Sequence, residues 1–261
     1  MTSAVRLRVA GVSHAYRDLP VLDNLDLEIP SGEVTVLVGP SGCGKSTLLG
    51  ILGGLVQPSR GAVRMDGTVA DDCLNPLTYV FQDFALVPWR SVAGNVSLVL
   101  EDSNLSRTER EARVAEVLAL TGLTDFAKAW PKQLSGGMRQ RVGIARALAV
   151  RPAVLLMDEP LSALDAQTRD LLLDEFADMI GRTGATTVYV THNLAEATRL
   201  GQQIVVMGRR PGRIRTVIRI DQTLAKRRAD DPDLLAVEAR LWALLREDAA
   251  AADRELADIH G

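Results

Sequence analysis

The sequence has only two cysteines, no excess of positive charge and no long hydrophobic segment. Cys43 and Cys73 are too few for a disulfide framework, so we expect a reducing compartment, the cytosol. A net charge of −3 argues against nucleic acid as the main partner. The longest apolar stretch, 48–56, is far short of the ~20 residues that span a bilayer, and the N-terminus lacks the apolar core of a signal peptide. Any role at a membrane would therefore require a partner and be exerted from the cytoplasmic side.

Hydrophobic residues make up 47% of the 261 residues and charged residues 24%, an ordinary balance for one large or two small globular domains. Apolar and polar residues alternate around 5–9 and 25–29, which predicts half-buried strands near the N-terminus. Later strands are expected at 33–39, 61–67, 78–82, 153–160, 186–192 and 203–207. Helical spacing is found at 45–55, 91–100, 106–120, 136–150, 166–182 and 233–246, and a further short helix is expected before the last strand.

This alternation of strands and helices predicts an α/β fold with a parallel sheet, an N-terminal antiparallel part and a helical insert at about 84–150. Ser106 and Glu109 fit a capping box at the start of one insert helix. In the tail, Leu234, Val237 and Leu241 share one helical face, together with Leu244, so the segment 233–246 is expected to pack on the body.

The segment GPSGCGKST at 39–47 matches the pattern G-x-x-x-x-G-K-[ST] between a strand and a helix, which is the context of a phosphate-binding loop. Glycines let backbone N–H groups face phosphate oxygens, and the helix N-terminus adds partial positive charge. Lys45 is expected to bridge the β- and γ-phosphates, and the Ser46 hydroxyl to ligate Mg²⁺. A chance glycine-rich turn is the alternative; a dinucleotide fingerprint fits worse, because Thr47 stands where its third glycine would fall. The predicted nucleotide-binding residues are Gly39, Pro40, Ser41, Gly42, Cys43, Gly44, Lys45, Ser46 and Thr47.

Two acidic residues end the apolar strand at 154–157. A carboxylate at the carboxyl edge of a parallel sheet lies near the phosphate site, so Asp158 is a candidate for the magnesium shell. Glu159 is then placed to accept a proton from an attacking water. The alternative, two solvated acids at a strand end, fits less well beside a phosphate loop.

A second anion-binding pattern, LSGGMRQR, covers residues 134–141. Ser135, Gly136 and Gly137 offer a hydroxyl and unobstructed N–H groups at the start of a helix. An ordinary N-cap by Ser135 explains the same residues equally well, and this segment alone does not decide between them.

Taken in order, the motifs resemble those of the ATP-binding subunit of an ABC transporter. They are Tyr16, GPSGCGKST, Gln82 in VFQD, LSGGM, VLLMDEP, SALD at 162–165 and His192 in VTHN. The resemblance covers about 5–220 and implies an ATP-binding domain over 1–220, with a P-loop NTPase (RecA-like) core, and a helical tail over 221–261.

The resemblance also implies a mechanism with ATP and Mg²⁺ as cofactors. Two subunits would dimerise head to tail, so that Ser135, Gly136 and Gly137 contact the nucleotide of the partner. Tyr16 would stack on adenine, and Gln82 would contact Mg²⁺ or the lytic water. Asp165 would lie in a loop that crosses the dimer interface. His192 would contact the γ-phosphate and position Glu159.

The family pattern also narrows what is transported. The stretches FQDFALVPWRSVAGNV and GRRPGRI resemble importer subunits for nitrate, taurine and aliphatic sulfonates, which act with separate permeases and a solute-binding protein. Thiamine-precursor importers remain an alternative, as does a soluble ABC ATPase outside transport. Met138 stands where the family most often has glutamine, which removes one side-chain hydrogen bond.

Two further expectations concern particular side chains. Phe84, Leu86, Pro88 and Trp89 are expected to line a groove for a permease helix, unless they form a buried loop. The thiol of Cys43, beside Lys45 at a helix N-terminus, is expected to have a lowered pKa and high reactivity.

Overall fold

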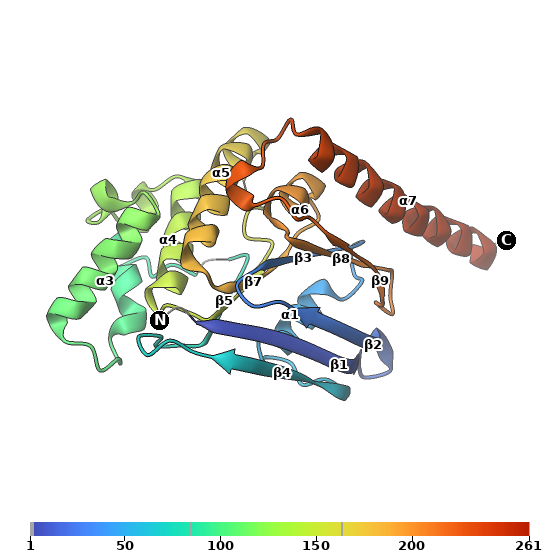
Figure 1. The fold of residues 1–261 in the computed structure, drawn as a ribbon, viewed down its shortest axis with the longest axis horizontal. Helices are drawn as coiled ribbons and strands as arrows, with labels where there is room; N and C mark the ends of the chain where they lie inside the picture. The colour runs from blue at the N-terminus through green and yellow to red at the C-terminus, as the bar shows by residue number, and fades with distance from the viewer. Residues whose placement is uncertain (1–2, 84, 163, 261) are drawn as a thin grey trace.

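The computed structural model describes residues 3–83, 85–162 and 164–260. Figure 1 shows an antiparallel sheet at the bottom, a central sheet beneath helices, a helical lobe on the left and a long last helix that extends to the right. This arrangement confirms the predicted α/β class, with its antiparallel N-terminal part and helical insert.

The antiparallel sheet has the strand order β2-β1-β4. Its strands are β1 (Ala4–Tyr16), β2 (Leu19–Ile29) and β4 (Arg60–Thr68). Buried and exposed residues alternate along β1 and β2, so one face of the sheet packs on the core and the other meets solvent.

The central sheet has the order β5-β6-β7-β3-β8-β9. Its parallel strands are β3 (Val34–Val38), β5 (Leu77–Val80), β6 (Val154–Asp158), β7 (Thr186–Val190) and β8 (Gln203–Met207). Strand β9 (Ile214–Arg219) pairs antiparallel with β8 at the edge and was not predicted. The continuous apolar runs are explained by packing on both faces: Val36 and Val38 join one hydrophobic cluster, whereas Leu37 between them joins the other.

The helices of the body connect these strands. They are α1 (Lys45–Leu52), α2 (Val92–Ser97), α3 (Arg107–Leu120), α4 (Gly136–Ala149), α5 (Ala166–Thr183) and α6 (Leu194–Leu200). Short 3₁₀ turns lie at Leu98–Leu100, Thr124–Phe126, Pro131–Gln133 and Leu224–Lys226. Helix α1 ends earlier than predicted because Gly53 and Gly54 follow it, Gly54 with a φ of 69°. The capping box of Ser106 and Glu109 is confirmed.

The last helix, α7 (Pro232–His260), is longer than the predicted 233–246. Leu234 and Leu241 are buried against the body, as their spacing predicted. The chain before α7 is held by Arg227, whose buried guanidinium donates to the carbonyl oxygens of Thr198, Gly201 and others at the end of α6. Burial lowers the pKa of Arg227 to about 10. No helix of the described residues is long and apolar enough to cross a bilayer.

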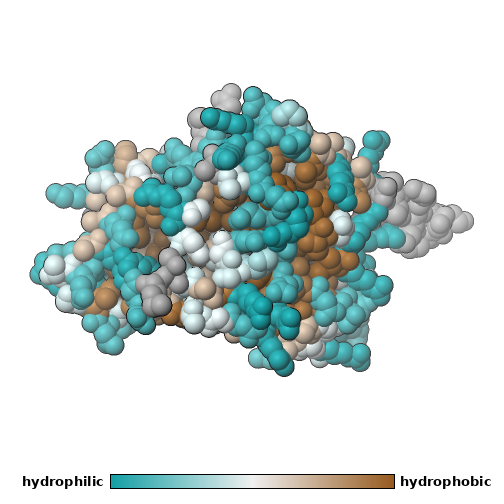
Figure 2. All heavy atoms as spheres, in the orientation of Figure 1, coloured by the Kyte–Doolittle hydropathy of each residue, from teal (hydrophilic) through white to brown (hydrophobic). Residues whose placement is uncertain are grey.

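Hydrophilic side chains cover most of the face seen in Figure 2, and the largest hydrophobic area lies right of centre, with smaller ones on the left. Beneath this surface, two hydrophobic clusters pack on the two faces of the central sheet. Their packing positions the loops at the carboxyl edge of the sheet.

Candidate functional site

The loop that follows β3 has the backbone of a phosphate-binding loop. Gly42 and Gly44 have φ of 75° and 97°, a region that other residues adopt only at a cost. Gly44 is the N-cap of α1 and offers no side chain to the first N–H groups of the helix. These N–H groups and the helix dipole can therefore bind an anion.

Lys45 lies along this loop. Its Nζ donates to the carbonyl oxygens of Gly39 at 2.8 Å and of Pro40 at 3.0 Å, and the side chain is buried. The ammonium group thus adds positive charge within the loop that the sequence predicted to hold phosphates.

The prediction for Cys43 was wrong. The thiol is fully buried, and burial raises its pKa by more than the nearby Lys45 lowers it. The helix N-terminus and the lysine favour a thiolate, but removal from water disfavours any charged form more strongly.

Ser46 and Asp158 meet at the carboxyl edge of the central sheet. The Ser46 hydroxyl donates to Asp158 Oδ1 at 3.1 Å, and the Tyr79 hydroxyl donates to Oδ2 at 3.3 Å. Burial raises the pKa of Asp158, although both hydrogen bonds oppose this shift.

This pair of oxygens suits Mg²⁺, which takes few protein ligands and keeps several waters. Within the described part of the chain, no group of three or more His, Cys, Asp or Glu side chains is placed to hold a metal ion.

Glu159 and His192 lie next to this pair. Glu159 has a φ of 46°, and its backbone N–H donates to the carbonyl oxygen of Val190 at 3.0 Å. The loop after β7 places His192 Nδ1 3.1 Å from Glu159 Oε2. A carboxylate and an imidazole in contact beside a phosphate loop can together move and hold a proton.

Gln82 makes a contact that the sequence did not predict. Its Nε2 donates to the hydroxyl of Ser162 at 3.1 Å, and that hydroxyl donates to the carbonyl oxygen of Glu159 at 2.8 Å. Gln82 is therefore linked to the backbone of the residue predicted to be the base.

The remaining predicted residues lie further apart. Tyr16 ends β1, is 50% exposed and packs edge-on against His14, with ring centroids 4.6 Å apart. Asp165 is exposed just before α5. The Ser135 hydroxyl accepts from the N–H of Met138 and caps α4 in the helical lobe, away from the core that carries the phosphate loop. The structure thus shows the N-cap, one of the two interpretations left open by the sequence.

Gly212, between β8 and β9, supports the phosphate loop and was missed. Its N–H donates to the carbonyl oxygen of Val21 at 2.7 Å, and its own carbonyl accepts from the N–H of Asp23 at 3.0 Å. A methyl group at Gly212 would lie 2.1 Å from the carbonyl oxygen of Cys43. The glycine and proline of GRRPGRI were the available signal, because a close backbone approach requires glycine.

A surface loop presents Trp89, which is 74% exposed. The loop is fixed by Asn95, a fully buried side chain whose amide donates to the carbonyl oxygens of Val87, Arg90 and Ser91 and accepts from the N–H of Val87. Pro88 is exposed and Leu86 partly buried, whereas Phe84 lies outside the described residues.

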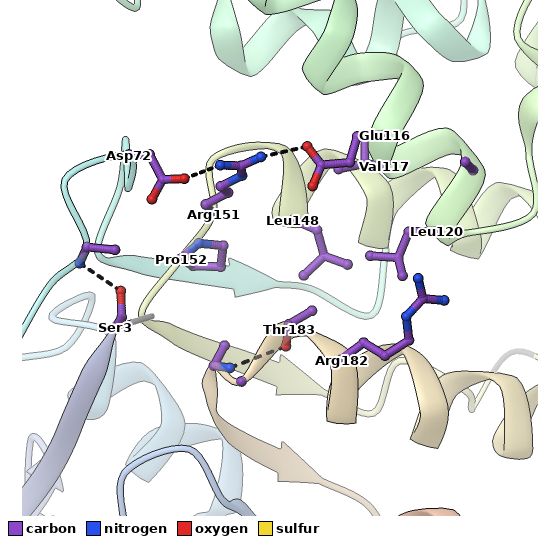
Figure 3. Close-up of a pocket in the computed structure, with 14 residues that line it drawn as sticks. Ser3, Asp72, Glu116, Val117, Leu120, Leu148, Arg151, Pro152, Arg182 and Thr183 are labelled. Carbon is purple, nitrogen blue, oxygen red and sulfur yellow. Dashed lines mark hydrogen bonds and ion pairs between the residues drawn. The ribbon is translucent and has the colours of Figure 1, made fainter. Parts of the chain in front are cut away.

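The two larger of the hollows beside the helical lobe lie in different places. One of about 680 Å³ lies between β5 and α4, and its walls include the stacked rings of Tyr79 and Phe81. Another, of about 520 Å³, lies at the amino ends of the central strands, on the side opposite to the phosphate loop. There Arg151 bridges Asp72 and Glu116 (Figure 3). Because this second hollow faces the amino ends of β6 and β7, it is separate from the phosphate loop.

Comparisons with known proteins agree on one family. A family model described as "ABC transporter" matches residues 22–162. The taurine import ATP-binding protein of Rhizobium johnstonii is 43% identical, with 90% of this chain and 89% of that protein covered. The aliphatic sulfonates import ATP-binding protein 1 of Xanthomonas axonopodis pv. citri is 42% identical over 84% of this chain and 87% of its own length.

Among solved structures, a dimeric ATP-binding cassette in a post-hydrolysis state with ADP and phosphate is similar. It has a TM-score of 0.69 and 34% identity, and the match covers 83% of this chain and 99% of that one.

Proposed function

This chain belongs to the ABC transporter family of ATP hydrolases, and from that premise we propose that two copies close around ATP to power solute import through separate permease subunits. The observation that carries the proposal is the set of contacts at one edge of the central sheet. Ser46 contacts Asp158, and Glu159 contacts His192, beside the loop that carries Lys45. These contacts support the proposal, because they would combine phosphate binding, a metal ligand set and a base in one place.

The triphosphate would bind at the N-terminus of α1. The uncapped N–H groups and the Lys45 ammonium would neutralise its charge, and the exposed ring of Tyr16 would stack on adenine. Ser46 and Asp158, with Gln82 nearby, would hold Mg²⁺, which when bound supplies positive charge to the phosphate oxygens.

For hydrolysis, Glu159 would take a proton from the attacking water. The water oxygen then forms the new bond to the γ-phosphorus, and the bond to the bridging oxygen of ADP breaks. His192 would hold the Glu159 carboxylate through the 3.1 Å contact and reach the γ-phosphate with its exposed edge.

A second copy would complete each site. Ser135 and Gly136 are exposed at a corner of the helical lobe, next to the buried Gly137, and the N–H groups of these three residues would cover the γ-phosphate held by the partner. The dimeric form of the similar cassette supports this arrangement. Closure would then depend on the γ-phosphate and be lost after hydrolysis.

The partner at the membrane would dock on the loop of Trp89, and the chain would work at the cytoplasmic face. A rigid loop with an exposed indole suits a permanent contact, because little side-chain freedom is lost on binding. Asn95 supplies that rigidity. The permease helix would also reach the hollow between β5 and α4, although Leu86, Pro88 and Trp89 do not line that hollow.

The dimer is tested with Glu159→Gln. This variant should bind ATP, lose turnover by about 10²–10⁴-fold and sediment as a dimer with Mg²⁺-ATP in analytical ultracentrifugation. Ser135→Arg on the same background should stay monomeric.

Ser106→Arg is the matched control, because Ser106 caps α3 as Ser135 caps α4. A dimer that forms equally well with Ser135→Arg would contradict the proposal, as would normal hydrolysis by Glu159→Gln.

The solute proposed is taurine, an aliphatic sulfonate or nitrate. The names of the similar import proteins favour taurine and aliphatic sulfonates. The alternative is a thiamine precursor. ATP hydrolysis by the complex with its permease and binding protein, measured with each candidate, distinguishes them. A chain that recruits no polytopic membrane protein would instead favour an ABC ATPase outside transport.

A further inference from the structure

A buried carboxylate behind the catalytic edge has no part in the mechanism above. Glu196 on α6 is 3% exposed. Its Oε2 accepts hydrogen bonds from the Tyr189 hydroxyl at 2.8 Å and from the Thr191 hydroxyl at 2.7 Å. Its Oε1 lies 3.6 Å from Nε of Arg169 on α5. The carboxylate thus joins α5, α6 and the end of β7.

Arg169 contacts the loop that contains Glu159 and Asp165. Its Nη2 donates to the carbonyl oxygen of Leu164 at 2.7 Å, and its Nε to that of Leu161 at 3.4 Å. One guanidinium group therefore holds two carbonyls of the loop 159–165 and the carboxylate of Glu196.

On the other side, Thr191 directly precedes His192. The Thr191 hydroxyl accepts from the N–H of Asn193 at 3.0 Å while it donates to Glu196. The contacts form a closed ring, because His192 itself touches Glu159 at the start of the loop 159–165.

A buried ion pair is a weak source of stability, because desolvation offsets most of the attraction. It can nevertheless fix the relative position of the segments it joins. We propose that Arg169 and Glu196 are positioning residues that lock the loop 159–165 to the loop of His192, so that Glu159 and His192 keep the geometry needed for hydrolysis. This inference rests on the proposed roles of those two residues. In the proposed dimer, a shift of Asp165 at the interface would be passed to both.

The test compares Glu196→Gln and Arg169→Lys in the full-length chain. Glu196→Gln keeps an acceptor for Tyr189 and Thr191 but loses the charge that attracts Arg169. Arg169→Lys keeps the charge but cannot hold both loop carbonyls. For each we expect kcat for ATP hydrolysis to fall about 10- to 100-fold, with KM for ATP within about twofold of the original.

Asp174→Asn is the matched control. Asp174 pairs with Arg199, so this variant also removes an ion pair between α5 and α6, but away from both loops. Its kcat should not change, and its melting temperature should change little, because the Asp174 side chain is 67% exposed. The double variant of Arg169 and Glu196 should be no less active than the less active of the two single variants, since the pair acts as a unit.

A normal kcat in Glu196→Gln or Arg169→Lys would overturn the inference, and so would an equal loss in Asp174→Asn. If either single variant fails to fold, the other decides. Glu159→Gln is assayed alongside: if it hydrolyses ATP normally, the proposed base is wrong, whereas an inactive Glu159→Gln with a fully active Glu196→Gln contradicts only the positioning role.

Discussion

Replacing Gly212 by alanine should displace the phosphate loop. The added Cβ would lie 2.1 Å from the carbonyl oxygen of Cys43, whereas ordinary contact begins at 3.4 Å, so the two atoms would have to separate by about 1.3 Å. Gly212 cannot easily withdraw, because two backbone hydrogen bonds tie it to Val21 and Asp23 in β2, and Arg213 pairs with Asp23. The phosphate loop must therefore absorb much of the shift.

A displacement of about 1 Å can lower the rate of a reaction at a positioned site on the order of 100-fold, and we expect a comparable effect on phosphate binding. We expect Gly212→Ala to weaken the binding of a non-hydrolysable ATP analogue by about 10- to 100-fold, or ~1.4–2.7 kcal/mol, in isothermal titration calorimetry.

Gly184→Ala separates this contact from general damage. Gly184 has a φ of 64°, so alanine strains the backbone there, but a Cβ would meet nothing within 4 Å. Its melting temperature should fall while the affinity for the analogue is kept. An affinity within about twofold of the original in Gly212→Ala would refute the argument that Gly212 supports the loop.

Three further predictions follow from other parts of the molecule. Trp89→Ala should reduce uptake by at least about 10-fold without changing ATP affinity, whereas Trp242→Ala, also strongly exposed, should transport normally; equal uptake by both would exclude the docking role. Burial raises the pKa of both thiols, but Cys73 is the less buried, so maleimide at pH 7 should label Cys73 before Cys43, as mass spectrometry of peptides can show. Burial likewise raises the pKa of Asp158, so its contribution to stability is present below about pH 4 and lost as the pH rises through the folded-state pKa. Asp158→Asn should then melt at a higher temperature at pH 7 in calorimetry but lose hydrolysis; a lower melting temperature would contradict this sign.

Local signals in the sequence were sufficient for much of the fold. The capping box of Ser106 and Glu109 needs only residues three apart, and the motif at 39–47 carries its own turn chemistry. Strand β9 was missed because its pairing with β8 is a tertiary contact and its burial is incomplete at the sheet edge.

In the site, sequence identified the ionisable residues but not their surroundings. The pKa of Cys43 depends on burial, which neighbouring residues in the chain do not reveal. Gly212 and Asn95 act through backbone groups brought close by the fold, and the ion pair of Arg169 and Glu196 joins residues from different helices. The roles assigned to all the site residues, including the phosphate loop, Glu159 and His192, stay predictions.

The left-handed backbone of Glu159 affects which residues can replace it during evolution or in a mutant library. A non-glycine residue there costs on the order of 1–3 kcal/mol, and glycine would relieve that strain. With Glu159 as the proposed base, heat resistance and turnover would favour different residues at position 159. A library of variants screened only for survival of heating would be enriched in chains that have lost the proposed base, so such a screen has to be paired with an assay of ATP hydrolysis.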